Sequence, residues 1–104
     1  MKNARIYRAN FSGANLKGAN LVNLIFQGNL SGADLSDAKL CGANLSFGNL
    51  SWANLENADL RGANLERTNL EHANLKGAKG ANFGQGDAKA NLTGAIMPDG
   101  TTHE

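Results

Sequence analysis

Residues 28–77 read GNLSGADLSDAKLCGANLSFGNLSWANLENADLRGANLERTNLEHANLKG without interruption. The stretch consists of ten units of five residues, and the centre of every unit is a leucine. Two positions before each leucine stands a small residue, usually alanine, and between the two stands a polar residue, usually asparagine. This period of five decides the fold. The central residues are Leu30, Leu35, Leu40, Leu45, Leu50, Leu55, Leu60, Leu65, Leu70 and Leu75.

A period of five excludes an amphipathic helix, because each step of five on an α-helix advances a side chain by about 140° beyond a full turn. Within one unit, the order small, polar, large is the alternation of a short strand with its polar residue outward. The two remaining residues must turn the chain. Asparagine, which tolerates positive φ, fills the second turn position at Asn23 and Asn57. Glycine fills it, as a corner with positive φ requires, at Gly13, Gly18, Gly32, Gly42, Gly62, Gly77 and Gly94.

A chain that turns the same way every five residues closes into coils, and these coils must stack to form one continuous core. The sequence therefore predicts a β-solenoid lined by leucine and alanine. Irregular residues recur at a spacing of twenty, which indicates four units per coil. The recurring sets are Lys39, Asp59 and Lys79; Glu56 and Lys76; Phe47 and Arg67; and Trp52 and His72.

These units resemble the pentapeptide repeat family, whose pattern is A(D/N)LXX. Ten units match in phase and five more precede them, so the resemblance covers nearly the whole chain. It implies an all-β protein, a right-handed quadrilateral parallel β-helix of about five coils, with the leucine and alanine inward. The right-handed sense also agrees with the general preference of parallel crossovers. The family is abundant in cyanobacteria, and the final residues ANLTGAIMPDGTTHE are similar to the ends of several members.

We expect a single domain over residues 1–104, most regular at 28–77, with one register fault before that stretch. From Phe26 to Leu30 there are four residues instead of five, and Ile25 stands in a position that normally points outward. Either Ile25 contacts a partner, or the chain repacks locally around the missing residue.

Residues 78–90 are irregular and rich in glycine. We expect Ala88 to take a central position there and to leave a thinner core that opens readily, because alanine cannot fill the space of a leucine. Pro98, Asp99 and Gly100 signal a turn. The tail, 98–104, is therefore expected either to lie across the last coil or to be loose.

The composition gives little sign of a charged partner or a membrane. The net charge is +1, from ten bases and nine acids. The single cysteine, Cys41, excludes an internal disulfide and suits a reducing compartment. With no signal-peptide pattern and no apolar run long enough for a bilayer, we expect a cytoplasmic protein that binds neither membrane nor nucleic acid directly.

No constellation of residues indicates an enzyme, a cofactor or a metal site. His72 and His103 lie far apart, without a second ligand at metal-binding spacing. The thiol of Cys41 is interpreted as a surface group without a role. The recurring asparagines are expected to form hydrogen-bonded ladders along the outside of the rod. We therefore assign no catalytic, cofactor or metal residue.

Two large aromatic residues, Phe47 and Trp52, occupy successive outward corners where other units have glycine or a polar residue. One interpretation is that each stacks on its neighbour one coil further on, Arg67 and His72 respectively. The other is that they are exposed anchors for a protein partner. Both can hold together, so these four residues and Ile25 are the candidate partner contacts.

The leading hypothesis is a non-enzymatic structural or protein-interaction module that binds an unidentified protein, as a monomer or a weak end-to-end dimer. The alternative comes from the resemblance, because some family members mimic DNA, bind DNA gyrase or topoisomerase, and give quinolone resistance. Such a mimic needs about one negative charge per 1.7 Å of axis. Over a rod of about 25 Å, that is about fifteen net negative charges. The near-neutral chain therefore favours the first hypothesis.

Overall fold

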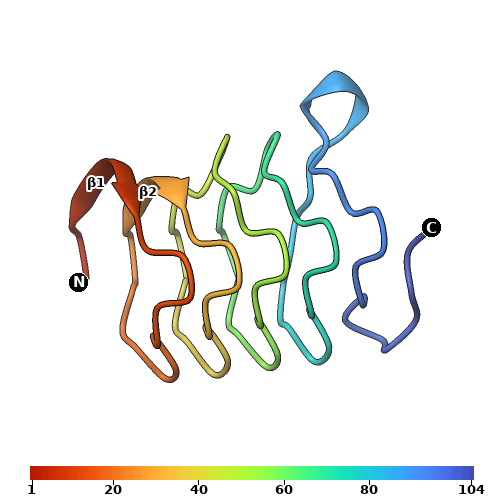
Figure 1. Cartoon of the computed structure of the whole chain (residues 1–104), viewed down its shortest axis with the longest axis horizontal. Helices are drawn as coiled ribbons and strands as arrows, with labels where there is room; N and C mark the ends of the chain where they lie inside the picture. Colours follow the sequence, from red (N-terminus) through yellow and green to blue (C-terminus); the bar gives the residue numbers. More distant parts are fainter.

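The computed structural model describes residues 1–104 as a rod of stacked coils, 32 × 27 × 23 Å in extent (Figure 1). The coils are residues 4–23, 24–42, 43–62, 63–80 and 81–104, numbered here as the first to the fifth. Two segments form named strands, β1 (Arg5–Asn10) and β2 (Ile25–Asn29), which pair in parallel. A short 3₁₀ helix, η1, covers Gly86–Ala88. The architecture is the predicted all-β, right-handed quadrilateral β-helix.

Adjacent coils are joined by parallel backbone bridges at the polar residue that precedes each leucine. Within the regular stretch the bridged residues are twenty apart, as for Asn29 and Asn49, or Lys39 and Asp59. The predicted four units per coil are thereby confirmed. Across the fault the spacing falls to nineteen, as for Asn15 and Asp34.

The interior is a continuous column of leucine and alanine. All ten central leucines are at most 2% exposed, which confirms the prediction that they line the core. Thr68, which replaces an alanine, is also buried, and its hydroxyl donates to the carbonyl of Leu45 at 2.9 Å. That bond satisfies a polar group in an apolar interior, so the substitution is tolerated.

The asparagines do not form the ladders we expected. Their side-chain oxygens instead accept from the backbone N–H two residues further on: Ser51 donates to Asn49 at 3.0 Å, and Glu56 donates to Asn54 at 3.0 Å. This Asx turn fixes the first half of each corner locally. Cross-coil bonds of these amides go to glutamates instead, as from Asn91 to Glu71 at 3.0 Å.

The register fault is absorbed by local repacking around Phe26, which is buried and lies 5.1 Å from the ring of Phe11. Ile25 is half-buried and bridges Arg5 on one side and Asn44 on the other. Its backbone thus belongs to the regular ladder. Of the two interpretations of Ile25, local repacking therefore describes the fold, and Ile25 is not fully exposed.

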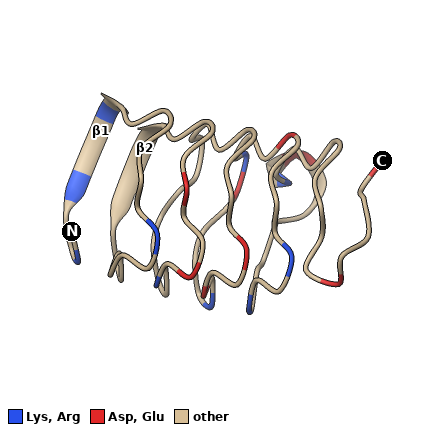
Figure 2. Ribbon diagram, turned by 60° about the horizontal axis from the view of Figure 1, so that its bottom comes forward, with Lys and Arg blue, Asp and Glu red and all other residues tan.

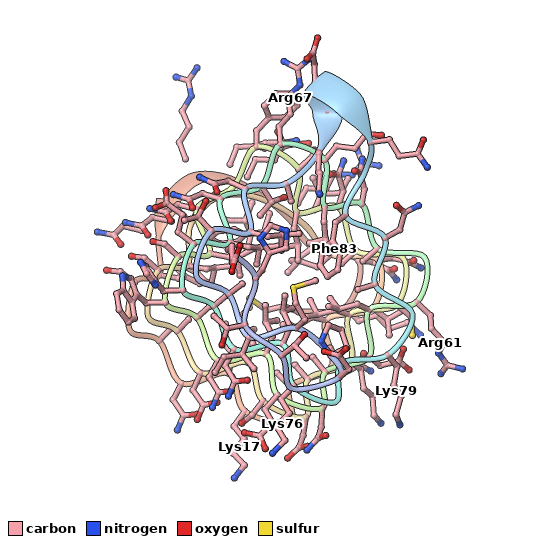
Figure 3. The ribbon with its side chains drawn as sticks, turned by 90° about the vertical axis from the view of Figure 1, so that its right-hand side faces the viewer. Lys17, Arg61, Arg67, Lys76, Lys79 and Phe83 are labelled. Carbon is pink, nitrogen blue, oxygen red and sulfur yellow. The ribbon has the colours of Figure 1, made fainter.

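The expectation for Ala88 was wrong. Phe83, and not Ala88, packs against the core, and Figure 3 shows Phe83 pointing into the rod. Residues 84–89 form a loop that projects from the rod and carries η1 (Figure 1). The N–H of Ala90 donates to Phe83 at 2.8 Å and closes this loop at its base. After it, bridged residues are twenty-two apart, as for Asn69 and Asn91.

The tail folds back across the last coil, which settles the two alternatives for residues 98–104. Thr102 bridges Ile96 in antiparallel fashion. His103 donates its N–H to Ala95 at 2.8 Å and accepts from Gly94 at 2.9 Å. The structure contains no helix of the length and apolar character needed to cross a membrane.

Candidate functional site

The two aromatic corners are the most unusual part of the surface. Phe47 and Trp52 are each 67% exposed. The indole of Trp52 stacks on the imidazole of His72, with ring centroids 4.3 Å apart and planes 22° from parallel. The guanidinium carbon of Arg67 lies 5.8 Å from the centre of the Phe47 ring. Both contacts predicted from the spacing of twenty are therefore present.

All four residues have a left-handed backbone. The φ angles are 61° for Phe47, 62° for Trp52, 55° for Arg67 and 58° for His72. For a non-glycine residue this conformation costs about 1–2 kcal/mol, and it is rare for bulky residues. The corner geometry imposes it, since the equivalent glycines have the same conformation, as in Gly32 with φ of 65°. Large residues at these corners therefore carry a local backbone cost, and backbone strain of this kind is often found at functional positions.

One face of each aromatic ring is left uncovered by the coil that precedes it. His72 covers Trp52 from the following coil, whereas the preceding coil has Gly32 at this corner. A side-chain carbon added to Gly32 would meet no atom within 4 Å. In front of Phe47, the register fault removes the corner residue altogether, because Gln27 is followed directly by Gly28. Two ring faces are consequently open to solvent on the same side.

The charged residues form small, mixed groups instead of one field, as Figure 2 shows along the rod. Arg61 donates from Nε to Asp59 at 2.8 Å and forms an ion pair with it. These bonds, followed by one from the Cys41 thiol, hold the pKa of Asp59 far below its usual value. Cys41 itself is a free, half-exposed thiol. Arg61 and Asp59 therefore neutralise each other on one face of the rod.

The remaining candidate residues are not assembled into a chemical centre. Ile25 lies on the neighbouring face, in the ladder beside Asn44. His103 belongs to the tail, where its carbonyl accepts from Gly94, the corner residue that lies against the His72 ring. The structure contains no group of three or more His, Cys, Asp or Glu residues that could hold a metal ion. The corners therefore offer aromatic rings and the Arg67 guanidinium as a contact surface.

Comparison with protein families agrees with this architecture. The sequence model described as "Pentapeptide repeats" matches eight copies, over residues 4–46, 25–56 and 49–83. The chain is a pentapeptide repeat protein. The family match stops before the part of the fifth coil that contains the projecting loop and the folded-back tail. No curated protein gave a significant match.

Solved structures similar to this pentapeptide repeat protein include three of the same family. HetL from the cyanobacterium Nostoc sp. strain PCC 7120, a protein involved in heterocyst differentiation regulation, is 36% identical with a TM-score of 0.74. That alignment covers 99% of this chain and 51% of HetL. The present chain therefore spans about half the length of that relative.

The other two similar structures come from a plant and a second cyanobacterium. A protein of the Arabidopsis thaliana thylakoid lumen is 37% identical with a TM-score of 0.65, over 80% of this chain and 62% of its own. Rfr23 from Cyanothece 51142 is 38% identical with a TM-score of 0.59, over 96% of this chain and 64% of its own. The same fold therefore occurs in cyanobacterial proteins and in a plant protein of the thylakoid lumen.

Proposed function

We propose that this pentapeptide repeat protein is a non-enzymatic interaction module that binds a partner protein through Phe47 and Trp52. The observation that carries the proposal is the pair of large aromatic side chains held outward in left-handed corners, each with one face open. Exposed aromatic residues on rigid supports are typical binding hot spots, because little side-chain freedom is lost on binding. Arg67 and His72 act as supports that fix the ring orientations.

A role in regulation by binding is compatible with the similarity to HetL, which is involved in heterocyst differentiation regulation. Ile25 contributes less to the proposed surface than the corners do, because it is half-buried and its backbone is paired on both sides. We propose a cytoplasmic location on the basis of the free thiol of Cys41, which suits a reducing compartment.

The test is affinity capture from a native lysate with three forms of the protein. The wild type is compared with a double variant, Phe47→Gly and Trp52→Gly, because glycine is the usual residue of this corner and relieves the backbone cost. Asn57→Gly is the matched control, since Asn57 has φ of 60° at another corner. We expect a partner that is retained by the wild type and the control and lost by the double variant. Equal capture by all three forms would refute the aromatic corners as the binding surface.

The alternative of a gyrase-binding DNA mimic is less well supported by the charge distribution. The chain has nine acids against ten bases, and in one bridged column Asp59 lies between Lys39 and Lys79. We therefore expect no effect on gyrase supercoiling, with or without a quinolone, at micromolar protein. Inhibition at sub-micromolar protein, abolished by neutralising Asp34, Glu56 and Asp59, would instead favour the mimic.

A further inference from the structure

Large side chains at the corners lie against the coil that follows them. A side-chain carbon added to Gly77 would overlap the Asn57 amide of the preceding coil, and one added to Gly94 would overlap the His72 ring. Trp52 has the same arrangement, because its indole stacks on His72 of the next coil. The opposite face of the indole is therefore left for the preceding coil to cover.

The corner that precedes Trp52 has no side chain in two successive coils. Gly32 occupies this corner in the second coil, and Gly13 occupies it in the first. Both glycines are exposed, and a side-chain carbon added to either would meet no atom within 4 Å. Non-bonded carbon atoms pack at about 3.5–4.0 Å, so a flat group can lie here without a clash. We call Trp52, Gly32 and Gly13 the Trp52 corner.

The free backbone groups of these two glycines are acceptors. The N–H of Gly32 donates to Ser51 at 2.9 Å, and the N–H of Gly13 donates to Ser31 at 2.9 Å. The carbonyls of Gly13 and Gly32 accept no backbone hydrogen bond. An aromatic face carries the negative part of the ring quadrupole, and a free carbonyl accepts hydrogen bonds. The Trp52 corner therefore complements a group that is cationic and donates hydrogen bonds.

The charges near this corner along the chain agree with a cationic ligand. Within residues 28–38 the charged residues are Asp34 and Asp37, and both are acidic. Lys17, at the next corner of the first coil, is close enough to Asp34 to lower the pKa of that carboxyl, after the larger effect of the hydrogen bonds from Ser36. The local field is therefore not one that repels a cation.

The Phe47 corner differs in this respect. Arg67 already places a guanidinium on one face of the Phe47 ring. Arg8 occupies the equivalent corner of the first coil, with φ of 58°. Neither arginine takes part in an ion pair. A further cation is therefore favoured at Trp52 and not at Phe47, whose ring supplies apolar contact.

We propose that the open face of Trp52 binds an arginine side chain of the partner protein. This inference rests on the function proposed above and specifies the chemistry of the contact. The guanidinium stacks on the indole and donates to the carbonyl of Gly32. Tryptophan is the aromatic residue that binds cations best, and the planar guanidinium can stack and donate at the same time. The contact between Arg67 and Phe47 is an example of the same pairing within the protein.

The full-length ¹⁵N-labelled protein reports this contact directly, because Trp52 is its single tryptophan and gives one indole N–H resonance. The probes are the peptide acetyl-Gly-Arg-Gly-amide and its citrulline equivalent, which has nearly the same shape without the charge. Both are titrated at constant ionic strength. We expect the arginine peptide to shift the indole resonance saturably. It should bind about two- to fivefold more tightly than the citrulline peptide, as expected for an exposed cation–π contact.

Three variants test the geometry. Gly32→Asn should reduce arginine binding to the level of citrulline, because the new side chain fills the open space, and asparagine tolerates the φ of 65°. Gly18→Asn is the matched control, since Gly18 has φ of 68° and open space at another corner. It should bind arginine as the wild type does, and both asparagine variants should have the same thermal stability. Phe47→Gly should leave the shift of the Trp52 indole unchanged.

Equal binding of the arginine and citrulline peptides would overturn the inference, as would arginine binding that survives Gly32→Asn. Competition in the capture experiment separates this inference from the proposed function. A partner that is held through Phe47 and Trp52 but is not displaced by the arginine peptide would overturn the arginine contact alone. Binding of the arginine peptide as expected, with capture that does not depend on the aromatic corners, would support the arginine site and refute the proposed function alone.

Discussion

Gly28 is the position where adding one methyl group should damage the fold most, although most equivalent units have alanine there. The register fault brings the second coil close to the first at this residue. A side-chain carbon on Gly28 would overlap the carbonyl oxygen of Ala9 and lie 3.0 Å from its nitrogen. Both are backbone atoms, so no flexible side chain can move aside.

The magnitude of Gly28→Ala follows from two opposing effects. Overpacking costs about 1–3 kcal/mol, and the upper end applies because backbone must shift. Gly28 has no positive φ, so alanine adds no conformational strain and stabilises by about 0.4–1 kcal/mol through the unfolded chain. We expect a net loss of about 2 kcal/mol in the free energy of unfolding.

Urea unfolding followed by far-UV circular dichroism measures this loss. Gly32→Ala is the control, because Gly32 has φ of 65° and open space around it. This variant should lose only about 1 kcal/mol of unfolding free energy, from backbone strain alone. The reasoning fails if Gly28→Ala is as stable as the wild type, or if it is less damaging than Gly32→Ala.

Three further predictions concern the core, the loop and the acid response. Leu55→Ala should cost about 2–5 kcal/mol in urea unfolding, because Leu55 is 0% exposed, and a loss below about 0.5 kcal/mol would mean that the interior is loosely packed. Residues 78–90 should exchange amide hydrogens faster than 28–77 because their ladder is interrupted, whereas uniform protection would contradict this. A hydrogen bond from the Ser36 side chain lowers the pKa of Asp34. Its stabilisation is therefore present above the unfolded pKa of about 3.9 and is lost as the pH falls below that value through the lower pKa of the folded state. Asp34→Asn should reduce the acid sensitivity in an unfolding titration, and an unchanged pH profile would count against that bond.

The regular part of the fold could be predicted from the sequence because each unit encodes its own geometry. Leu55 and its equivalents point inward by strand alternation, and glycine or asparagine at the corner specifies the turn. The spacing of twenty alone predicts that His72 lies beside Trp52 and Arg67 beside Phe47, and both contacts are present. Long-range contacts were predictable here because a solenoid converts sequence separation directly into position.

The irregular part could not be predicted for the same physical reason. Once the chain leaves the period, position no longer follows from counting, and a large residue competes for the core on its volume. Phe83 therefore took the interior site that counting gave to Ala88. The interrupted backbone ladder at Leu65 accompanies that displacement, because the residues that follow Phe83 turn outward into the projecting loop. The departure from the pattern after Leu75 was a signal of irregularity, but it did not place the projecting loop.

The left-handed corners have a consequence for how such a rod can evolve. A residue with φ near 60° directs its side chain away from the core whatever that side chain is, as Trp52 and His72 show at equivalent corners. Mutations at corners therefore change the surface without altering the packing of Leu50 or Leu70 behind them. Partner specificity and fold stability are encoded in different residues of each repeat. A lineage can accordingly acquire a new partner by genetic drift at its corners while its interior remains under constant selection.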